Sequence, residues 1–281
     1  GGGGACGAEL YHTGLTMQVR LAFGLEEDGT RHRLARLREL TGNEELLMAE
    51  LADHLTPAAY ATTLLVAMTE RIGSVQSPSY DQCAALPVGD RERLLLAICT
   101  MVAGSQIDLV ANCPSCATEL EIGMPLHEML DAGNAGSEAD RTILISESEG
   151  DWRVEMRLPT GADKERCAAT ALTDPSRAAR DLVVGCVLRL IDPEGKPVAV
   201  TDLPTAFESI LSAEFEKADE MADLSATMTC PDCGTAFNAA VDGLGVLRAA
   251  LGQSHGIFGD VYRMARRYHW SEREILTLPR T

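Results

Sequence analysis

The stretch TCPDCGTAFNAAV at residues 229–241 contains two cysteines in a C-P-x-C pattern, followed by a glycine. A second stretch, NCPSCATELEIGM at residues 112–124, repeats the pattern with an alanine after its second cysteine. Proline fixes φ after the first thiolate, and the small residue lets the backbone amides turn toward sulfur. Short alternating segments, typical of β-strands, flank each pair. The sequence therefore predicts two hairpins of the zinc-knuckle type, each with a cysteine pair at its tip.

Two such pairs supply the four ligands of a tetrahedral Zn²⁺ ion. We predict that one structural Zn²⁺ ion is bound by Cys113, Cys116, Cys230 and Cys233, and that the two hairpins meet as a zinc ribbon. The pairs lie much farther apart than the roughly 15–20 residues of compact zinc sites. Loop-closure entropy grows only logarithmically with length, so a structured insert is acceptable. The alternatives are two turns without metal, or pairs completed by another chain. A thioredoxin-like redox pair is disfavoured, because neither C-x-x-C opens a helix in a βαβ unit.

The composition predicts a soluble intracellular protein with a substantial core. The chain has 281 residues, of which 46% are hydrophobic, and this length suits one large domain or two small ones. No apolar run is long enough to span a bilayer, and GGGGACGA at residues 1–8 predicts a flexible lead-in. Cysteines outside the knuckles show no disulfide spacing, and four lie in apolar helical patterns that predict buried free thiols: Cys83, Cys99, Cys167 and Cys186.

The chain is strongly acidic, with a net charge of −18 from 42 acidic and 24 basic residues. Binding to nucleic acid depends on lysine and arginine side chains that neutralise phosphates, so we expect neither nucleic acid nor membrane as a partner. Two basic segments interrupt this trend, RHRLARLR at residues 31–38 and RMARRYH at residues 263–269. Solvated faces explain both, and an acidic protein partner is the alternative.

An internal repeat is indicated by two L-P-x-G motifs, LPVGDRE at residues 86–92 and LPTGADKE at residues 158–165. Each precedes an apolar helical pattern, and we predict that Asp90 and Asp163 cap these helices. Each motif also precedes a knuckle, with a longer insert in the second copy. This order of turn, helix and knuckle hairpin predicts a duplication with the two knuckles at its centre.

The remaining patterns predict an α+β fold of helices with several β-hairpins. Segments 17–23 and 31–38 alternate across an Asp-Gly turn, which is a strong hairpin signal, and a further hairpin is expected across Glu149-Gly150. Helices are expected over residues 41–53, 56–73, 176–191 and 203–218. Four regions are predicted: a lead-in at 1–16, a hairpin with helices at 17–84, the duplicated knuckle core at 85–243 and a helical segment at 244–281.

The C-terminal stretch HGIFGDVYRMARRYHWSEREILTLP, residues 255–279, predicts an amphipathic helix and then a short helix. Ser271 and Glu274 have the spacing of a capping box at the start of that last helix. Tyr262, Tyr268 and Trp270 either pack in the core or bind a partner.

Together, AALPVGDRERLLLAI, two CPxC hairpins and the ending YHWSEREILTLP resemble the baseplate hub assembly proteins (chaperones) of T-even-type phages and related contractile-tail prophages, over residues 31–279. The resemblance implies a non-enzymatic assembly factor or structural component of the baseplate hub in a phage or phage-derived contractile injection system. It implies hub, spike or tape-measure proteins as partners. It also implies the host bacterial cytoplasm as the location, with retention in the tail particle in some tails.

Two other functions are open from the residues alone. An enzyme is disfavoured, because a closed Cys₄ zinc has no free position for water and no G-x-S-x-G, H-E-x-x-H or Walker loop is present. The stronger alternative is a cytosolic zinc-ribbon adaptor unrelated to tails. Neighbouring genes for tail tube, spike or tape-measure proteins would favour the hub function over the adaptor.

Overall fold

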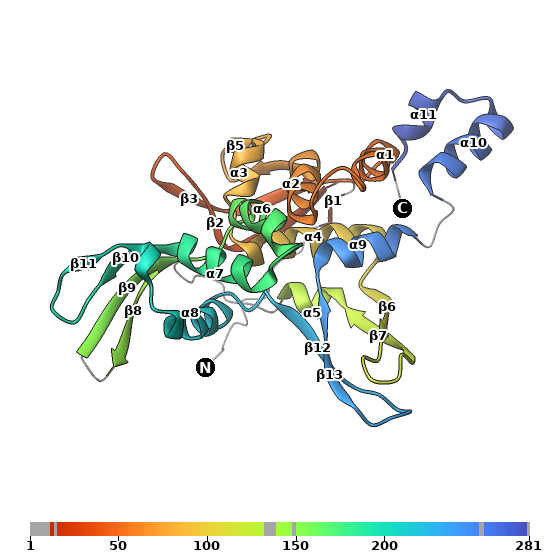
Figure 1. The fold of residues 1–281 in the computed structure, drawn as a ribbon. Coiled ribbons are helices and arrows are strands. Elements are labelled where there is room, and N and C mark those ends of the chain that lie inside the picture. The colour runs from red at the N-terminus through yellow and green to blue at the C-terminus, as the bar shows by residue number, and fades with distance from the viewer. Residues whose placement is uncertain (1–11, 14–15, 132–138, 148–149, 253–255, 280–281) are drawn as a thin grey trace, which may run out of the picture.

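The computed structural model of the chain describes residues 12–13, 16–131, 139–147, 150–252 and 256–279. Helices and antiparallel hairpins are arranged in two units with the same order of elements, and a pair of C-terminal helices follows (Figure 1). The predicted α+β fold is confirmed, as are the hairpin strands flanking both knuckles. The lead-in at residues 1–8 and Glu149 of the predicted turn lie outside the described residues.

The first unit starts with a long hairpin in a five-stranded antiparallel sheet of order β1-β2-β3-β4-β5. Two helices, a short hairpin, a short helix, a long helix, a knuckle hairpin and a final short helix follow. The elements are β1 (His12–Thr13), β2 (Thr16–Glu27), β3 (Thr30–Arg38), α1 (Gly42–Leu51), α2 (Pro57–Met68), β4 (Thr69–Ile72), β5 (Val75–Gln76), α3 (Tyr80–Ala84), α4 (Val88–Ala103), β6 (Gln106–Asn112), β7 (Glu119–Pro125) and α5 (Leu126–Asp131).

The second unit repeats this order around a four-stranded antiparallel sheet of order β11-β10-β9-β8. A hairpin again leads to two helices, a short hairpin, a one-turn helix, a long helix and a knuckle hairpin. The elements are β8 (Asp140–Glu147), β9 (Gly150–Arg157), α6 (Gly161–Ala171), α7 (Pro175–Cys186), β10 (Val187–Ile191), β11 (Pro197–Val198), η1 (Val200–Asp202), α8 (Thr205–Ala218), β12 (Leu224–Thr229), β13 (Ala236–Val241) and α9 (Gly243–Gly252), before the C-terminal α10 (Ile257–Tyr268) and α11 (Glu272–Leu276).

The repeat is longer than the L-P-x-G motifs predicted, and its alignment differs. The helix after LPTG is α6, whose counterpart in the first unit is α1, because each follows the second strand of a long hairpin. The counterpart of α4 is α8, since each starts directly after a Leu-Pro pair and leads to a knuckle. Leu-Pro therefore precedes helices at two different places in the repeat. The predicted domain boundaries stay a prediction.

Two helices end earlier than predicted. The pattern over residues 56–73 gives α2 and then β4, which pairs with β3. Likewise, the pattern over residues 176–191 gives α7 and then β10, which pairs with β9. Short apolar runs fit both helix and strand periodicity, and here a neighbouring strand with unpaired backbone groups decides the outcome.

The described residues form two hydrophobic cores, and each takes some side chains from the other unit, Leu244 and Leu247 of α9 in the first and Phe23 of β2 in the second. The first surrounds α4, where Leu94 and Ile98 have no exposed surface, and the second lies between the β8–β11 sheet and helices α7 and α8. The four predicted buried thiols are confirmed, at Cys83, Cys99, Cys167 and Cys186.

Asp90 does not cap α4, contrary to the prediction. The N-cap residue is Pro87, which makes no side-chain cap bond, and in the first turn the Gly89 N–H donates to the Asp219 carboxylate at 2.8 Å. The buried carboxylate of Asp90 instead accepts backbone N–H bonds from Ala22, Phe23 and Gly24 at 2.6, 3.0 and 2.6 Å. These residues lie where the β2–β3 register shifts, so the interrupted strand lacks part of its ladder there. Asp90 therefore replaces strand partners for an irregular stretch of β2.

Asp163 contributes to a helix cap, although as the third residue of α6 and not as its N-cap. Thr160 is the N-cap, and its backbone N–H donates to the Asp163 carboxylate at 2.9 Å in a capping box. Arg157 and Arg166 also bond this carboxylate, at 2.5 and 2.6 Å. Burial opposes ionisation of Asp163, but the bonds from Arg157, Thr160 and Arg166 prevail and lower its pKa.

Candidate metal centre

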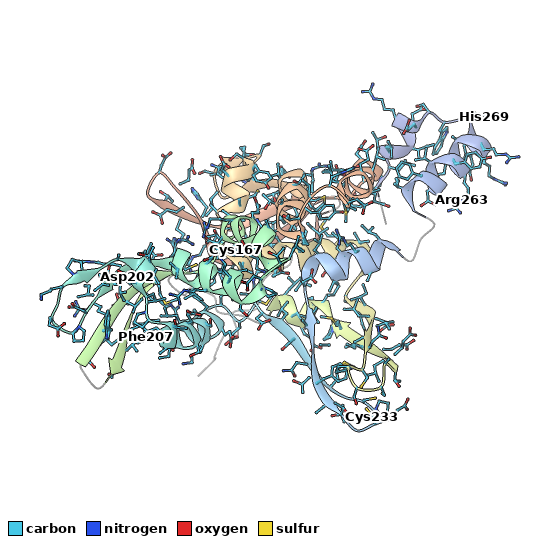
Figure 2. The ribbon with its side chains drawn as sticks, viewed as in Figure 1. Cys167, Asp202, Phe207, Cys233, Arg263 and His269 are labelled. Carbon is cyan, nitrogen blue, oxygen red and sulfur yellow. The ribbon has the colours of Figure 1, made fainter. Side chains whose placement is uncertain are left out.

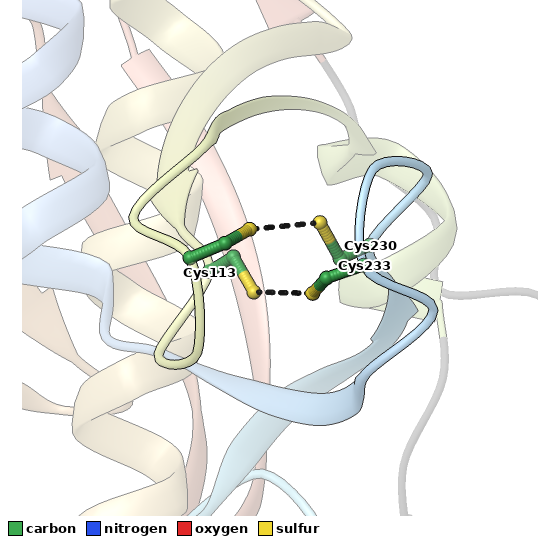
Figure 3. A group of neighbouring side chains, drawn as sticks. Cys113, Cys230 and Cys233 are labelled. Carbon is green, nitrogen blue, oxygen red and sulfur yellow. Dashed lines mark hydrogen bonds between the residues drawn. The ribbon is translucent and has the colours of Figure 1, made fainter.

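The four knuckle cysteines converge at the tips of the two hairpins. Cys113 Sγ lies 3.6 Å from Cys233 Sγ, and Cys116 Sγ lies 3.5 Å from Cys230 Sγ. All four sulfur atoms lie within 4.8 Å of one another. Figure 3 shows the two knuckles facing each other, with sulfur atoms pointing into the space between them. Residues far apart in the sequence thus form one cluster.

Both knuckles have the same backbone structure. In the first, the amide of Ala117 donates to the Cys113 carbonyl at 2.9 Å, and in the second Gly234 donates to Cys230 at 2.9 Å. Both donors have positive φ, +58° for Ala117 and +72° for Gly234. This left-handed conformation costs glycine little and alanine more. The left-handed backbone therefore explains the glycine of the second knuckle, whereas a Cβ on Gly234 would meet no atom within 4 Å, so the turn selects for backbone conformation and not for the small size that the sequence pattern predicted.

The sulfur cluster fits a four-thiolate zinc site. A Zn–S bond of about 2.3 Å in tetrahedral geometry places sulfur atoms about 3.8 Å apart, close to the two measured distances of 3.5 and 3.6 Å. These distances are far longer than the roughly 2.05 Å of a disulfide bond. Both pairs belong to one chain, so no second chain is needed to complete the site. The predicted ligands therefore form one candidate metal site and a fold consistent with a zinc ribbon.

Polar groups favour the thiolate at the exposed cysteine of each knuckle, Cys116 and Cys233. The Thr235 hydroxyl lies 3.3 Å from Cys233 Sγ, and the Thr118 hydroxyl lies 3.2 Å from Cys116 Sγ. Hydrogen bonding with the side chain and backbone of Thr235 lowers the pKa of Cys233 to about 6, and hydrogen bonding with Thr118 lowers the pKa of Cys116, whereas the pKa of Cys230 is raised to about 11. A zinc ligand must be deprotonated, so these threonines prepare the exposed cysteine of each knuckle. Thr118 also donates to Asp232 at 2.8 Å and joins the two knuckles directly.

The long helix α4 holds both knuckle hairpins in place. It leads into β6, and its Glu92 carboxylate accepts the backbone N–H of Gly243 at 2.7 Å, where α9 begins after β13. Cys99 of α4 contacts the Gly243 carbonyl at 3.5 Å. The sequence predicted no tertiary partner for Glu92. Its function in joining the two units has no sequence signal, because its partner is 151 residues away.

The three C-terminal aromatic side chains do not pack in the core. Tyr262 is 63% exposed, Tyr268 is 54% exposed and Trp270 is 42% exposed. The rings of Tyr268 and Trp270 lie 5.4 Å apart, and Phe258 adds a further ring that is 63% exposed. The core-packing alternative is therefore wrong for these residues. Sequence reasoning missed Phe258, although its spacing of four residues from Tyr262 places both on one helix face.

The aromatic residues and the metal cluster lie far apart. In Figure 2 Cys233 marks the tips of the knuckle hairpins at the lower right, whereas Arg263 and His269 mark a C-terminal arm, α10 and α11, that projects at the upper right. The predicted capping box of Ser271 and Glu274 is confirmed at the start of α11. The candidate metal site and the exposed aromatic residues of the C-terminal arm are therefore two separate sites on the molecule.

Among the described helices, none combines the length and apolar character needed to cross a membrane.

Comparisons with known proteins identify the family. No curated protein and no solved structure matches the chain. The family described as T4 bacteriophage base plate protein matches residues 30–245, a span that includes β3, α4, both knuckles and the second long hairpin. The chain therefore belongs to the T4 bacteriophage base plate protein family.

Proposed function

We propose that this chain is a non-enzymatic assembly factor or structural component of the baseplate hub in a phage or phage-derived contractile tail. The family match over residues 30–245 carries the proposal. The family match supports a baseplate protein, and the more specific assignment to the hub is supported by the ordered resemblance of residues 31–279 described above. The family disfavours the alternative of an adaptor unrelated to tails.

The structure supports a structural function for the metal centre. Four thiolates would fill the coordination shell of Zn²⁺ and leave no position for a substrate or a reactive water. When bound, the ion would supply a crosslink between the two units. Among the described residues, the four cysteines form a cluster whose sulfur atoms are close enough together to bind one metal ion. This arrangement supports a stable framework and offers no support for catalysis.

The C-terminal arm supports a function in binding proteins. Exposed Tyr262, Tyr268 and Trp270 provide the large aromatic surface that interface hot spots use. Arginines on α10 add positive charge in a chain whose net charge is −18, which favours acidic protein surfaces. Hub, spike or tape-measure proteins of the tail are the proposed partners. The host bacterial cytoplasm, where such parts would assemble, is the proposed location.

Deletion of the gene and a single substitution test the proposal. Deletion should abolish complete tails, and Trp270→Ala should reduce tail particles while the purified protein keeps its melting temperature. Leu172→Ala is the matched control, because Leu172 is 83% exposed at the C-cap of α6, and it should leave tail numbers unchanged. Normal tails after deletion would refute the assembly function. Loss of tails with equal severity in both substitutions would refute the aromatic surface as the contact.

A further inference from the structure

The structure contains the same backbone contact twice. The backbone N–H of Gly161, at the start of α6, donates to the Leu86 carbonyl at 3.2 Å, and Pro87 forms an isolated antiparallel bridge with Thr160. At the start of α1, the N–H of Gly42 donates to the Leu278 carbonyl at 3.3 Å, and Pro279 forms the same bridge with Thr41. A Leu-Pro pair thus meets a Thr-Gly helix start at both places.

We call the two Thr-Gly helix starts acceptors and the Leu-Pro segments donors, because each helix start receives a docked segment; the names do not refer to hydrogen-bond direction. The two acceptors are built alike. Thr41 forms a capping box with Glu44, which also bonds Arg38 at 2.8 Å. In the second unit, Thr160 forms a capping box with Asp163, which bonds Arg157 at 2.5 Å. In both units the arginine ends a strand three residues before the threonine. The acceptors are therefore equivalent parts of the two units.

The two donors are also built alike. Residues 79–87 begin with a Ser79–Gln82 capping box, continue through the five-residue helix α3 and end in Leu-Pro. Residues 271–279 begin with a Ser271–Glu274 capping box, continue through the five-residue helix α11 and end in Leu-Pro at the same spacing. One donor sequence pattern, Ser-x-x-Gln/Glu-x-x-x-Leu-Pro, therefore occurs twice in the chain with the same structure.

Sterics explain why each acceptor needs glycine. A Cβ atom on Gly42 would lie 2.9 Å from the Cα of Leu276, inside the donor. On Gly161 it would lie 2.3 Å from the Arg91 guanidinium, beyond the Leu-Pro pair that docks there. Neither glycine has positive φ, so the constraint is close approach and not backbone conformation: at Gly42 the neighbour is fixed backbone, and at Gly161 it is the side chain of Arg91, which would have to shift.

The two donors differ in how firmly they are held. Donor 79–87 continues directly into α4, and its Leu86 is completely buried. Donor 271–279 belongs to the C-terminal arm, which packs on α1 and whose Leu278 is 37% exposed. Within this arm, the residues buried on α10 and α11 are Ile257, Ile275 and Leu276. A small apolar contact and one backbone contact therefore hold the arm on its acceptor.

We infer that the start of α1 at Thr41–Gly42 is a docking site that the C-terminal donor of a second copy of this chain can occupy, so that two chains exchange arms. An exchanged donor makes the same contacts as the chain's own donor, as in domain swapping generally. The arm projects from the body (Figure 1) with Phe258 and Tyr262 exposed. The arm carries Arg266 and Arg267 in the last turn of α10, and the first turn of α1 carries Glu44 and Glu45, so the arm and its docking site have opposite local charges.

Two full-length variants with complementary defects test this inference. Leu276→Asp places a charge at a buried donor position, so that chain has a free acceptor and no working donor. Gly42→Val blocks the acceptor and leaves the donor free. Each variant alone should sediment as a monomer of 30.1 kDa, and an equal mixture should form a species of twice that mass. The chain carrying both substitutions is the control, and it should not associate with Gly42→Val.

Each outcome decides the inference. A mixture of folded variants that stays monomeric up to the solubility limit would overturn it. Association of either variant alone would place the interface elsewhere and would also overturn it. If Gly42→Val unfolds, Gly42→Ala adds the same Cβ with the smallest possible side chain and replaces it. The measurement uses the purified chain alone, so its result is independent of any function in tails.

Discussion

Replacing Asp90 tests the network that supports the irregular part of β2. Its carboxylate is completely buried, and it accepts three backbone N–H bonds, of which those from Ala22 and Phe23 are buried. Asp90→Ala leaves these donors without an acceptor. A buried unsatisfied donor costs about 1–3 kcal/mol, so two of them lower the free energy of unfolding by about 2–6 kcal/mol. Removing a carboxylate whose pKa is raised by burial offsets part of this loss, so we expect the lower half of that range.

Asp90→Asn should give an intermediate result. Oδ2 of Asp90 accepts from Phe23 and Gly24, and Oδ1 accepts from Ala22. The single oxygen of asparagine can keep the first two bonds, while its amide N–H₂ group faces the Ala22 donor. One lost bond corresponds to about 1–3 kcal/mol. The expected order of destabilisation is therefore Ala, then Asn, then the exposed control Asp81→Ala, which should stay within about 0.5 kcal/mol of the parent protein.

Urea unfolding followed by tryptophan fluorescence measures this series. Trp152 packs edge-on against Phe207 in the core of the second unit, so its emission reports unfolding there, and circular dichroism reports both units together. The m-value should stay constant, because the mutations change stability and not the area exposed on unfolding. Equal midpoints for Asp90→Ala and Asp81→Ala would refute the reasoning, since the three bonds would then contribute nothing to stability.

Three further predictions concern the metal and pH. Protein purified without chelator should contain about one zinc per chain, and elemental analysis finding none would remove the shared site. Because metal binding is coupled to folding, Cys230→Ser should melt well below Cys167→Ser in thermal scans; equal melting temperatures would show that the knuckle is only a turn and that metal binding there adds no stability. Burial, opposed by the Gly89 N–H and assisted by the charge of Asp90, raises the pKa of Asp219 to about 6. A raised carboxyl pKa stabilises the fold below about pH 4 and loses that effect as pH rises through about 6, so Asp219→Asn should gain up to about 3 kcal/mol relative to wild type across this interval. A constant difference between the two proteins from pH 4 to 7 would contradict this assignment.

Local sequence patterns determined much of this protein. Proline and the residue after each cysteine pair specify the knuckle turn, and alternating residues beside them specify the strands. The capping box at Ser271 and the Asp-Gly turn between β2 and β3 were predictable for the same reason. In each case the residues that interact lie within a few positions of one another, so their spacing carries the information.

Tertiary structure decided what those local pieces contact. The facing sulfur pairs lie 114 and 120 residues apart in sequence, and only the pairing of the two units brings them together. Asp90 has the local signature of a cap, yet three amides 66 to 68 residues away bind it. Trp270 is a large apolar residue of the kind often buried in cores, but it is 42% exposed on the C-terminal arm. A side chain's partners depend on distant segments, because burial and unpaired backbone groups arise only when those segments pack together.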